Sequence, residues 1–156
     1  MKIAIYPGSF DPITNGHLDI LKRSLNVFDK IIVLVGYNSN KNARFSPTER
    51  KEMIEEVIKD EGLENVTVDM FEGLTVDYAL KHGAKYLIRG LRAVTDFEYE
   101  FQMASANDFA SSAQVDSVFF MSKNETSFIS SSMIIELHAR GVDVSPLVPK
   151  AVFKRL

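Results

Sequence analysis

Two segments of the sequence carry residue types suited to binding phosphate. The first, residues 7–17, follows an apolar run and ends in a histidine at the start of a helical pattern. Glycine allows a sharp turn or a close approach to a ligand, and the free N–H groups of a helix N-terminus favour an anion. Gly8, Gly16 and His17 therefore indicate an anion site, to which the His17 ring would add a donor. The plainer alternative is that His17 caps its helix or packs the loop.

The second segment contains two arginines. Arg89 and Arg92 flank Gly90, and guanidinium groups suit bidentate recognition of phosphate better than an ammonium group does. We expect a short loop that presents both arginines; the alternative is a pair of surface salt bridges. Lys41, in the polar loop 38–44, is a further candidate cation, although a lone loop lysine is usually solvated.

A run of hydroxyl side chains at residues 126–132 leads into another helical pattern. These hydroxyls either cap the helix or bind a phosphate chain at its N-terminus. The sequence lacks the phosphate loop, the dinucleotide fingerprint, the nucleophile elbow and the zinc-protease motif. Cationic donors without an evident base suit a reaction whose nucleophile arrives ionised, such as a phosphate monoester with a second pKa of about 6.

Short apolar runs alternate with helical patterns along the chain. The runs predict strands at 2–6, 31–37, 66–71, 86–88 and 116–121. The patterns predict helices at 16–28, 47–61, 75–82, 95–109 and 130–139, with a short last helix after a turn at 146–149. Capping boxes at Ser46 and Thr95 mark two helix starts, and Gly83 and Gly141 mark two helix ends.

The near-continuous apolar strands predict a parallel sheet with helices on both faces. We therefore expect an α/β, Rossmann-like fold, formed by a single domain over residues 1–156 with strand order 3-2-1-4-5. Ligands of such sheets bind beyond the carboxyl ends of the strands, where the strand order reverses. This point lies between strands one and four, so residues 7–17 and 89–92 should face each other.

Composition and charge exclude several classes of protein. With 18 Lys and Arg against 21 Asp and Glu, the net charge is −3, and no basic stripe marks a nucleic-acid binder. The chain has no cysteine, so disulfides and thiolate-ligated metals are excluded. The longest apolar run, Ile31 to Val35, is far shorter than the about 20 residues of a membrane span. The N-terminus lacks the pattern of a signal peptide, and we expect a cytoplasmic protein without membrane or nucleic-acid partners.

Taken together, these motifs resemble the bacterial phosphopantetheine adenylyltransferases of the nucleotidyltransferase superfamily, over essentially the whole chain. The matching motifs are Pro7-Gly8-Ser9-Phe10-Asp11-Pro12, Thr14-Asn15-Gly16-His17, Arg89-Gly90-Leu91-Arg92, Asp96-Phe97-Glu98-Tyr99-Glu100 and Phe128-Ile129-Ser130-Ser131-Ser132. Thr14 stands in place of the first histidine of the superfamily's H-x-G-H signature, which argues against the nicotinate-mononucleotide and cytidylyl branches. The resemblance implies that the phosphate of 4'-phosphopantetheine attacks the α-phosphorus of MgATP, giving dephospho-coenzyme A and pyrophosphate in the penultimate step of coenzyme A synthesis.

The resemblance also implies roles for individual residues. His17, Lys41 and Arg92 would share the charge that builds on the α-phosphate in the transition state. The residues implied for ATP binding are Ser9, Phe10, His17, Gly90, Leu91, Arg92, Glu100, Thr126, Ser127, Phe128, Ile129, Ser130, Ser131 and Ser132. Those implied for the acceptor are Ser9, Lys41, Thr75, Arg89, Asn107 and Glu136. Mg²⁺ is expected with ATP, without a metal site formed by protein ligands. The family's homohexameric assembly and its inhibition by coenzyme A are expected too.

The chain departs from the family pattern at Asp108, Phe109, Ile135 and Ala139, where relatives commonly carry basic residues. Two alternatives therefore stay open. One is a module that binds ATP or coenzyme A without catalysis, and the other is an adenylyltransferase that uses a different phosphorylated acceptor.

Overall fold

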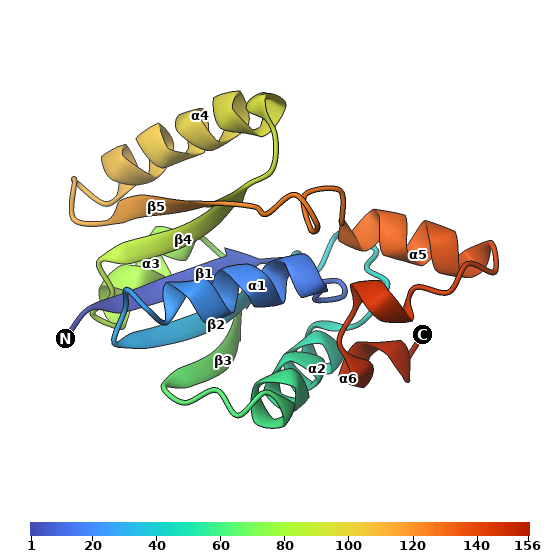
Figure 1. Ribbon diagram of the computed structural model, residues 1–156. Helices are drawn as coiled ribbons and strands as arrows, with labels where there is room; N and C mark the ends of the chain where they lie inside the picture. The colour runs from blue at the N-terminus through green and yellow to red at the C-terminus, as the bar shows by residue number, and fades with distance from the viewer.

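The computed structural model describes residues 1–156 except for the side chains of Val94 and Thr95. Its centre is one parallel sheet of order β3-β2-β1-β4-β5 (Figure 1). The strands are β1 (Ile3–Gly8), β2 (Lys30–Gly36), β3 (Val66–Phe71), β4 (Tyr86–Leu91) and β5 (Asp116–Met121). The predicted order and parallel pairing are therefore confirmed.

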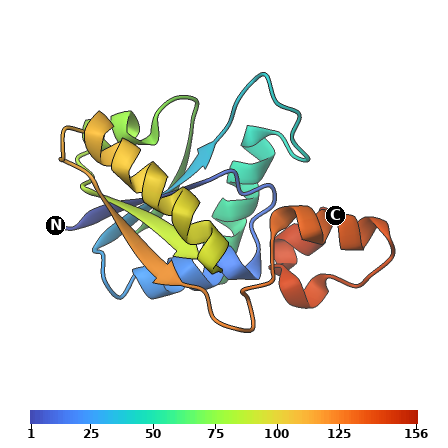
Figure 2. The same ribbon diagram turned by 90° about the horizontal axis from the view of Figure 1, so that it is seen from above.

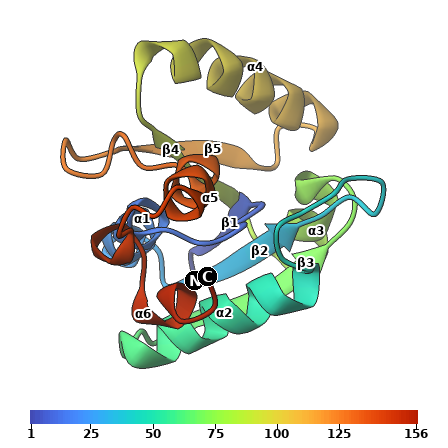
Figure 3. The ribbon, with the colours of Figure 1, turned by 90° about the vertical axis from the view of Figure 1, so that its right-hand side faces the viewer.

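Helices cover both faces of this sheet, as predicted (Figure 3). The helices are α1 (Asn15–Ser24), α2 (Pro47–Asp60), α3 (Thr75–Lys81), α4 (Val94–Ala110), α5 (Ser131–Ala139) and α6 (Lys150–Phe153), with a 3₁₀ turn at Ser145–Leu147. Helices α5 and α6 extend beyond the carboxyl ends of the strands (Figures 1 and 2). No helix in the described part of the chain is long and apolar enough to cross a membrane.

The apolar core lies on both sides of the sheet. Alternate side chains of β2 point to opposite faces of the sheet. Ile31 and Val33 pack in the cluster under α1 and α2, and Ile32 and Leu34 pack in the cluster under α3. All four side chains are buried. The fully buried central strand explains its continuous apolar sequence, because a parallel strand covered on both faces has no solvent-facing side.

Strand β4 is longer than the sequence predicts. It runs to Leu91 rather than ending at Ile88, and Arg89 and Gly90 align with Phe119 and Phe120 of β5. The predicted loop at 89–91 is therefore wrong. The apolar run ends at Ile88 in the sequence, but strand pairing is made by backbone groups and continues past it; the polar Arg89 side chain is accommodated by a carboxylate partner on α4.

The helix starts confirm one capping box and correct another. Ser46 and Glu49 form the predicted box at α2. Helix α4 begins at Val94 with Ala93 as its N-cap, so the predicted start behind a Thr95 box is wrong; the Thr95 side chain itself lies outside the described residues. At the other end of a helix, α1 stops at Ser24 rather than near Phe28, because the chain continues in turns after its last buried helical residue.

Candidate active site

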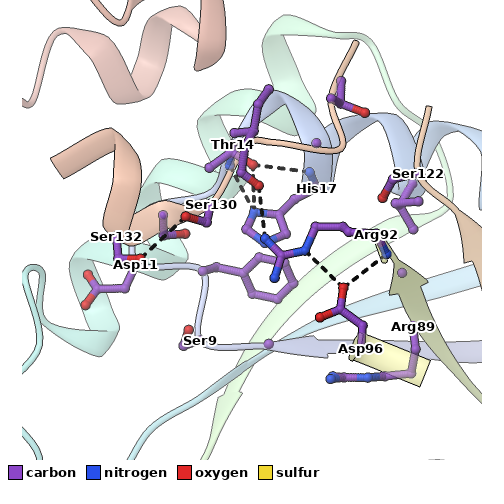
Figure 4. Close-up of a pocket in the computed structure, with 18 of the residues that line it drawn as sticks. Ser9, Asp11, Thr14, His17, Arg89, Arg92, Asp96, Ser122, Ser130 and Ser132 are labelled. Atoms are coloured by element: carbon purple, nitrogen blue, oxygen red, sulfur yellow. Dashed lines mark hydrogen bonds and ion pairs between the residues drawn. The ribbon is translucent and has the colours of Figure 1, made fainter. Parts of the chain in front are cut away.

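A cleft of about 870 Å³ opens at the carboxyl edge of the sheet (Figure 4). Its walls come from the β1–α1 loop, the end of β4, the start of α4, the β5–α5 loop and α5. The cleft brings together most of the expected site residues: Ser9, Phe10, His17, Arg89, Gly90, Arg92, Glu100, Thr126, Ile129, Ser130, Ser131, Ser132 and Glu136. The predicted meeting of the first loop and the end of strand four is thus observed.

The other expected residues lie outside the lining of this cleft: Lys41, Thr75, Leu91, Asn107, Ser127 and Phe128. Lys41 is exposed in the loop after β2, Thr75 is the first residue of α3, and Asn107 is near the end of α4. Two positions that depart from the family pattern, Ile135 and Ala139, do line the cleft, on the wall formed by α5.

His17 is held by the residue that caps its helix. The backbone N–H of Thr14 donates to His17 Nδ1 at 3.0 Å, and Thr14 Oγ1 accepts from the His17 backbone N–H at 3.4 Å. Because Nδ1 accepts a hydrogen bond, the neutral ring carries its proton on Nε2. The capping alternative is therefore true, and it coexists with the place of His17 in the cleft wall.

Burial and the charges of Arg92 and Arg89 lower the pKa of His17 from 6.5 to about 4. The ring is therefore neutral at pH 7. The Phe10 ring meets it edge-on, with ring centroids 5.0 Å apart, and this contact adds to the hydrogen bond from the Thr14 N–H that orients the ring. In Figure 4, His17 lies beside Thr14 and near Arg92.

Arg89 is held by a bidentate pair with Glu100 along one edge of its guanidinium group. Its Nε and Nη2 donate to the two Glu100 carboxylate oxygens at 2.9 and 2.7 Å. Burial lowers the pKa of Arg89, but the bonds and charge of Glu100 raise it overall. A salt bridge was the alternative for this arginine; the pair exists, but inside the cleft, where Glu100 is 7% exposed.

Arg92 links the end of β4 to the loop after β5. Its backbone N–H donates to Asp96 Oδ2 at 3.2 Å, its Nε lies 3.5 Å from the same oxygen, and its Nη1 donates to the Ile129 carbonyl at 3.3 Å. The dashed lines to Asp96 in Figure 4 mark this arrangement. The Arg92 side chain is 45% exposed, so its guanidinium remains open to a ligand.

The three serines at the start of α5 have different roles. Ser130 Oγ accepts from the Met133 backbone N–H at 3.2 Å and caps α5, and Ser131 Oγ donates to the Pro12 carbonyl at 2.7 Å. Ser132 is exposed, with its Oγ 3.4 Å from Ser130 Oγ. The capping alternative therefore accounts for one serine, a loop contact for the second, and the third is free to meet a ligand.

Several residues of the cleft were absent from the predicted site: Tyr6, Asp11, Thr14, Arg44, Asp96, Tyr99 and Ser122. Some had a signal in the sequence, since Asp11, Thr14, Asp96 and Tyr99 stand inside the motifs quoted above. Arg44 shares its polar loop with Lys41, and only the structure shows that Arg44 reaches the cleft. In the described part of the chain no group of three His, Asp or Glu side chains is placed to hold a metal ion.

Solved structures with the same fold include two adenylyltransferases. One, from Vibrio parahaemolyticus, is provisionally described as a nicotinate-nucleotide adenylyltransferase and superposes with a TM-score of 0.70 at 23% identity, over 97% of this chain and 90% of that one. The other is a bifunctional NMN adenylyltransferase/ADP ribose pyrophosphatase from Francisella tularensis, with a TM-score of 0.68 at 18% identity over 92% of this chain and 44% of that one. At these identities the likeness establishes the fold alone.

Sequence comparison is more specific. The cytidylyltransferase-like family model matches residues 5–137. A phosphopantetheine adenylyltransferase from Lachnoclostridium phytofermentans is 49% identical over 99% of this chain and 93% of its own. Another, from Geotalea daltonii, is 50% identical over 100% of this chain and 95% of its own. With such identity over the full length, and with the cleft placed where the strand order reverses, the chain belongs to the phosphopantetheine adenylyltransferase family.

Proposed function

We propose that the protein transfers the adenylyl group of ATP to 4'-phosphopantetheine, giving dephospho-coenzyme A and pyrophosphate. Relatives that are 47–50% identical over nearly the whole chain are named phosphopantetheine adenylyltransferases. The observation that carries the proposal is the neutral His17 ring, held by Thr14 in a cleft that also contains Arg92. This combination offers a fixed neutral donor and a cation to a reacting phosphate.

The reaction needs no protein base. An ionised oxygen of the acceptor phosphate attacks the α-phosphorus of ATP, the bond to the β-phosphate bridging oxygen breaks, and pyrophosphate leaves with those electrons. His17 Nε2–H would donate to an α-phosphate oxygen, and Arg92 would balance the charge that builds there. Catalysis then rests on positioning and electrostatic stabilisation.

The two substrates would occupy different walls of the cleft. The β5–α5 hydroxyls, Gly90 and Arg92 would bind ATP, whereas Arg89 would receive the acceptor phosphate near Ser9. Glu100, expected among the ATP ligands, has both oxygens on Arg89, so its first effect would be to orient that arginine. For Lys41 to join the phosphates, its exposed loop has to move toward the cleft.

Mg²⁺ would be bound mainly through the ATP phosphates and water, since the described residues include no carboxylate cluster for it. In that position it would neutralise phosphate charge. Coenzyme A contains the pantetheine arm and adenosine of the product, so it would compete for the same cleft and inhibit. An enzyme that draws on ATP and has no cysteine fits the cytoplasm.

Assembly into a homohexamer is supported by the outer surface of α4. Its exposed apolar side chains outside the cleft lining are Phe97, Phe101, Met103 and Phe109. Large exposed apolar side chains on one helix are typical of a protein interface. We propose that neighbouring copies of the chain bury these side chains of α4 in the assembly.

Pyrophosphate release from MgATP, with and without 4'-phosphopantetheine, tests the reaction. We expect release that requires the acceptor and is lost in His17→Ala. ATP binding without release would favour the non-catalytic module. Release only with another phosphorylated acceptor would keep the chemistry but change the substrate, and Ile135 and Ala139 on the α5 wall would then be the first positions to exchange.

A further inference from the structure

Arg50 is a buried arginine of α2 that the proposed reaction does not use. Its side chain is 3% exposed and lies outside the lining of the cleft. Its Nη1 donates to the Ser9 carbonyl at 2.8 Å and to the Gly36 carbonyl at 3.3 Å, and its Nε donates to the Phe45 carbonyl at 3.1 Å. One guanidinium thus joins the β1–α1 loop, the end of β2 and the β2–α2 loop.

Asp11 joins the same two loops through a second set of hydrogen bonds. Its carboxylate accepts the backbone N–H groups of Arg44 at 2.7 Å and Phe45 at 2.8 Å. Asp11 and Arg50 therefore hold the two loops together: Asp11 of the β1–α1 loop binds the backbone of the β2–α2 loop, and Arg50 of α2 binds the backbone of both loops. Ser9 and Arg44, one on each loop, both line the cleft.

Holding these loops together does not require that the donor be charged. None of the ion pairs found among the described side chains includes Arg50, and its three acceptors are neutral carbonyls. Burying a cation without a carboxylate is unfavourable. A positive charge directly behind a phosphate-binding cleft, however, favours the anion in front of it.

The Ser9–Phe10 peptide connects this charge to the cleft. In a trans peptide the N–H points opposite to the C=O, so the Phe10 N–H is directed away from Arg50. That N–H has no acceptor among the described residues, and Phe10 lines the cleft with its backbone in the left-handed region, at a φ of 47°. A charge-assisted bond to the Ser9 carbonyl polarises the peptide and strengthens its N–H as a donor.

We propose that Arg50 is a positioning residue, which fixes and polarises the Ser9–Phe10 peptide so that the Phe10 N–H donates to a substrate phosphate. The proposal rests on the adenylyl transfer proposed above and adds a residue outside the cleft to it. Arg50 acts through the peptide and does not itself touch the substrates.

The first test compares Arg50→Lys with a stability control on the same helix, Val57→Ala, whose side chain is buried in the core. Lysine keeps the charge but lacks the planar fork that reaches three carbonyls. We expect kcat of Arg50→Lys to fall about 10- to 100-fold, with a smaller change in the KM for ATP. Val57→Ala should lower the midpoint of thermal unfolding and leave kcat and KM unchanged. A folded Arg50→Lys protein with the wild-type kcat would overturn the proposal.

The second test uses the wild-type protein, so it holds even where Arg50→Lys fails to fold. The Phe10 amide resonance is followed while MgATP and, separately, 4'-phosphopantetheine are added. We expect one of these ligands to shift this amide more than any other amide of the β1–α1 loop. A Phe10 amide that neither ligand moves at saturation overturns the proposal. An inactive wild-type protein would refute adenylyl transfer, whereas the amide response would still decide whether the Phe10 N–H donates to a ligand, the step on which the role of Arg50 depends.

Discussion

Helices α1 and α4 both begin at the cleft, but the chain holds them in different ways. Helix α1 is capped by Thr14 and buries Leu18, Ile20 and Leu21 against the sheet. Helix α4 has Ala93 as its N-cap, which offers no side-chain acceptor, and Glu100 is the only buried residue among its described side chains. Figure 3 shows α4 outside β4 and β5, on the periphery of the molecule.

The difference separates two kinds of site residue. His17 is fixed by contacts within one helix turn and by a packed core, so its geometry is set by the single chain. Arg89 and Glu100 hold each other, and the helix that carries Glu100 exposes Phe101 at 61% and Phe109 at 88%. We therefore expect changes near α1 to act on the chemistry, and changes on α4 to act on acceptor binding and assembly.

The largest effect is expected from His17→Ala. Loss of one fixed donor to a developing charge lowers kcat about 100- to 1000-fold, while the KM for ATP changes little. His82→Ala is the matched control, because His82 stacks on Tyr78 at α3 and lies outside the cleft lining. Steady-state kinetics measure both variants, and a His17→Ala protein within twofold of wild type would refute the role of the ring.

A pH effect on stability should follow from the same ring. The pKa of His17 is about 4 in the fold and 6.5 in its absence, so between these values the unfolded chain binds a proton that the folded protein does not. Lowering the pH therefore destabilises the fold through this group, by at most about 2 kcal/mol between pH 7 and pH 5. Urea unfolding of wild type and His17→Gln checks this, since the variant should lose less stability over the same range. Equal losses would show that His17 is not held neutral.

On the α4 side, Glu100→Gln removes the charge that holds Arg89. We expect a loss of about 1 to 2 kcal/mol of unfolding free energy and a higher KM for 4'-phosphopantetheine, with little change in the KM for ATP. Glu98→Gln, an exposed neighbour on the same helix, is the control and should match wild type. A selective rise in the KM for ATP would instead assign Glu100 to the nucleotide.

Thr14→Val should have a smaller effect on α1. The substitution removes the capping hydroxyl but keeps the backbone N–H that binds His17 Nδ1. We expect a loss of about 1 kcal/mol in stability and a decrease of only a few-fold in kcat. Thr14→Ser retains the hydroxyl and should restore both, and a failure of serine to do so would point to the lost methyl group rather than to the cap.

The smallest effect on the isolated chain is expected from Phe101→Ser. The side chain is exposed, so the unfolding free energy of a monomer should change by less than about 0.5 kcal/mol. If α4 is covered by another copy, the same change should shift the mass in light scattering toward smaller species. An unchanged mass would show that this surface is not the interface.

Local rules predicted most of the elements. Strands β3 and β5 have the expected bounds, and the Ser46 box starts α2 as expected. These features depend on residues close together in the chain. The end of β4 was misplaced because Arg89 is polar in sequence but paired in space with Glu100 of the next helix. The start of α4 was misplaced because this helix begins behind Ala93 with no side-chain cap for a sequence motif to reveal.

The sequence by itself determined the strand order, the meeting of residues 7–17 with 89–92, and the family to which the chain was expected to belong. The strand order and this meeting follow from the Rossmann-like class that the alternating apolar runs and helical patterns predict, and the family follows from short motifs; none of these needs knowledge of distant contacts. Only the tertiary structure decided that Nδ1 of His17 is an acceptor, that Arg89 is engaged by Glu100, and that Arg50 lies behind the Ser9 carbonyl. Hydrogen bonds and desolvation depend on which groups lie close together in the folded chain. Local sequence does not determine which distant residues come into contact.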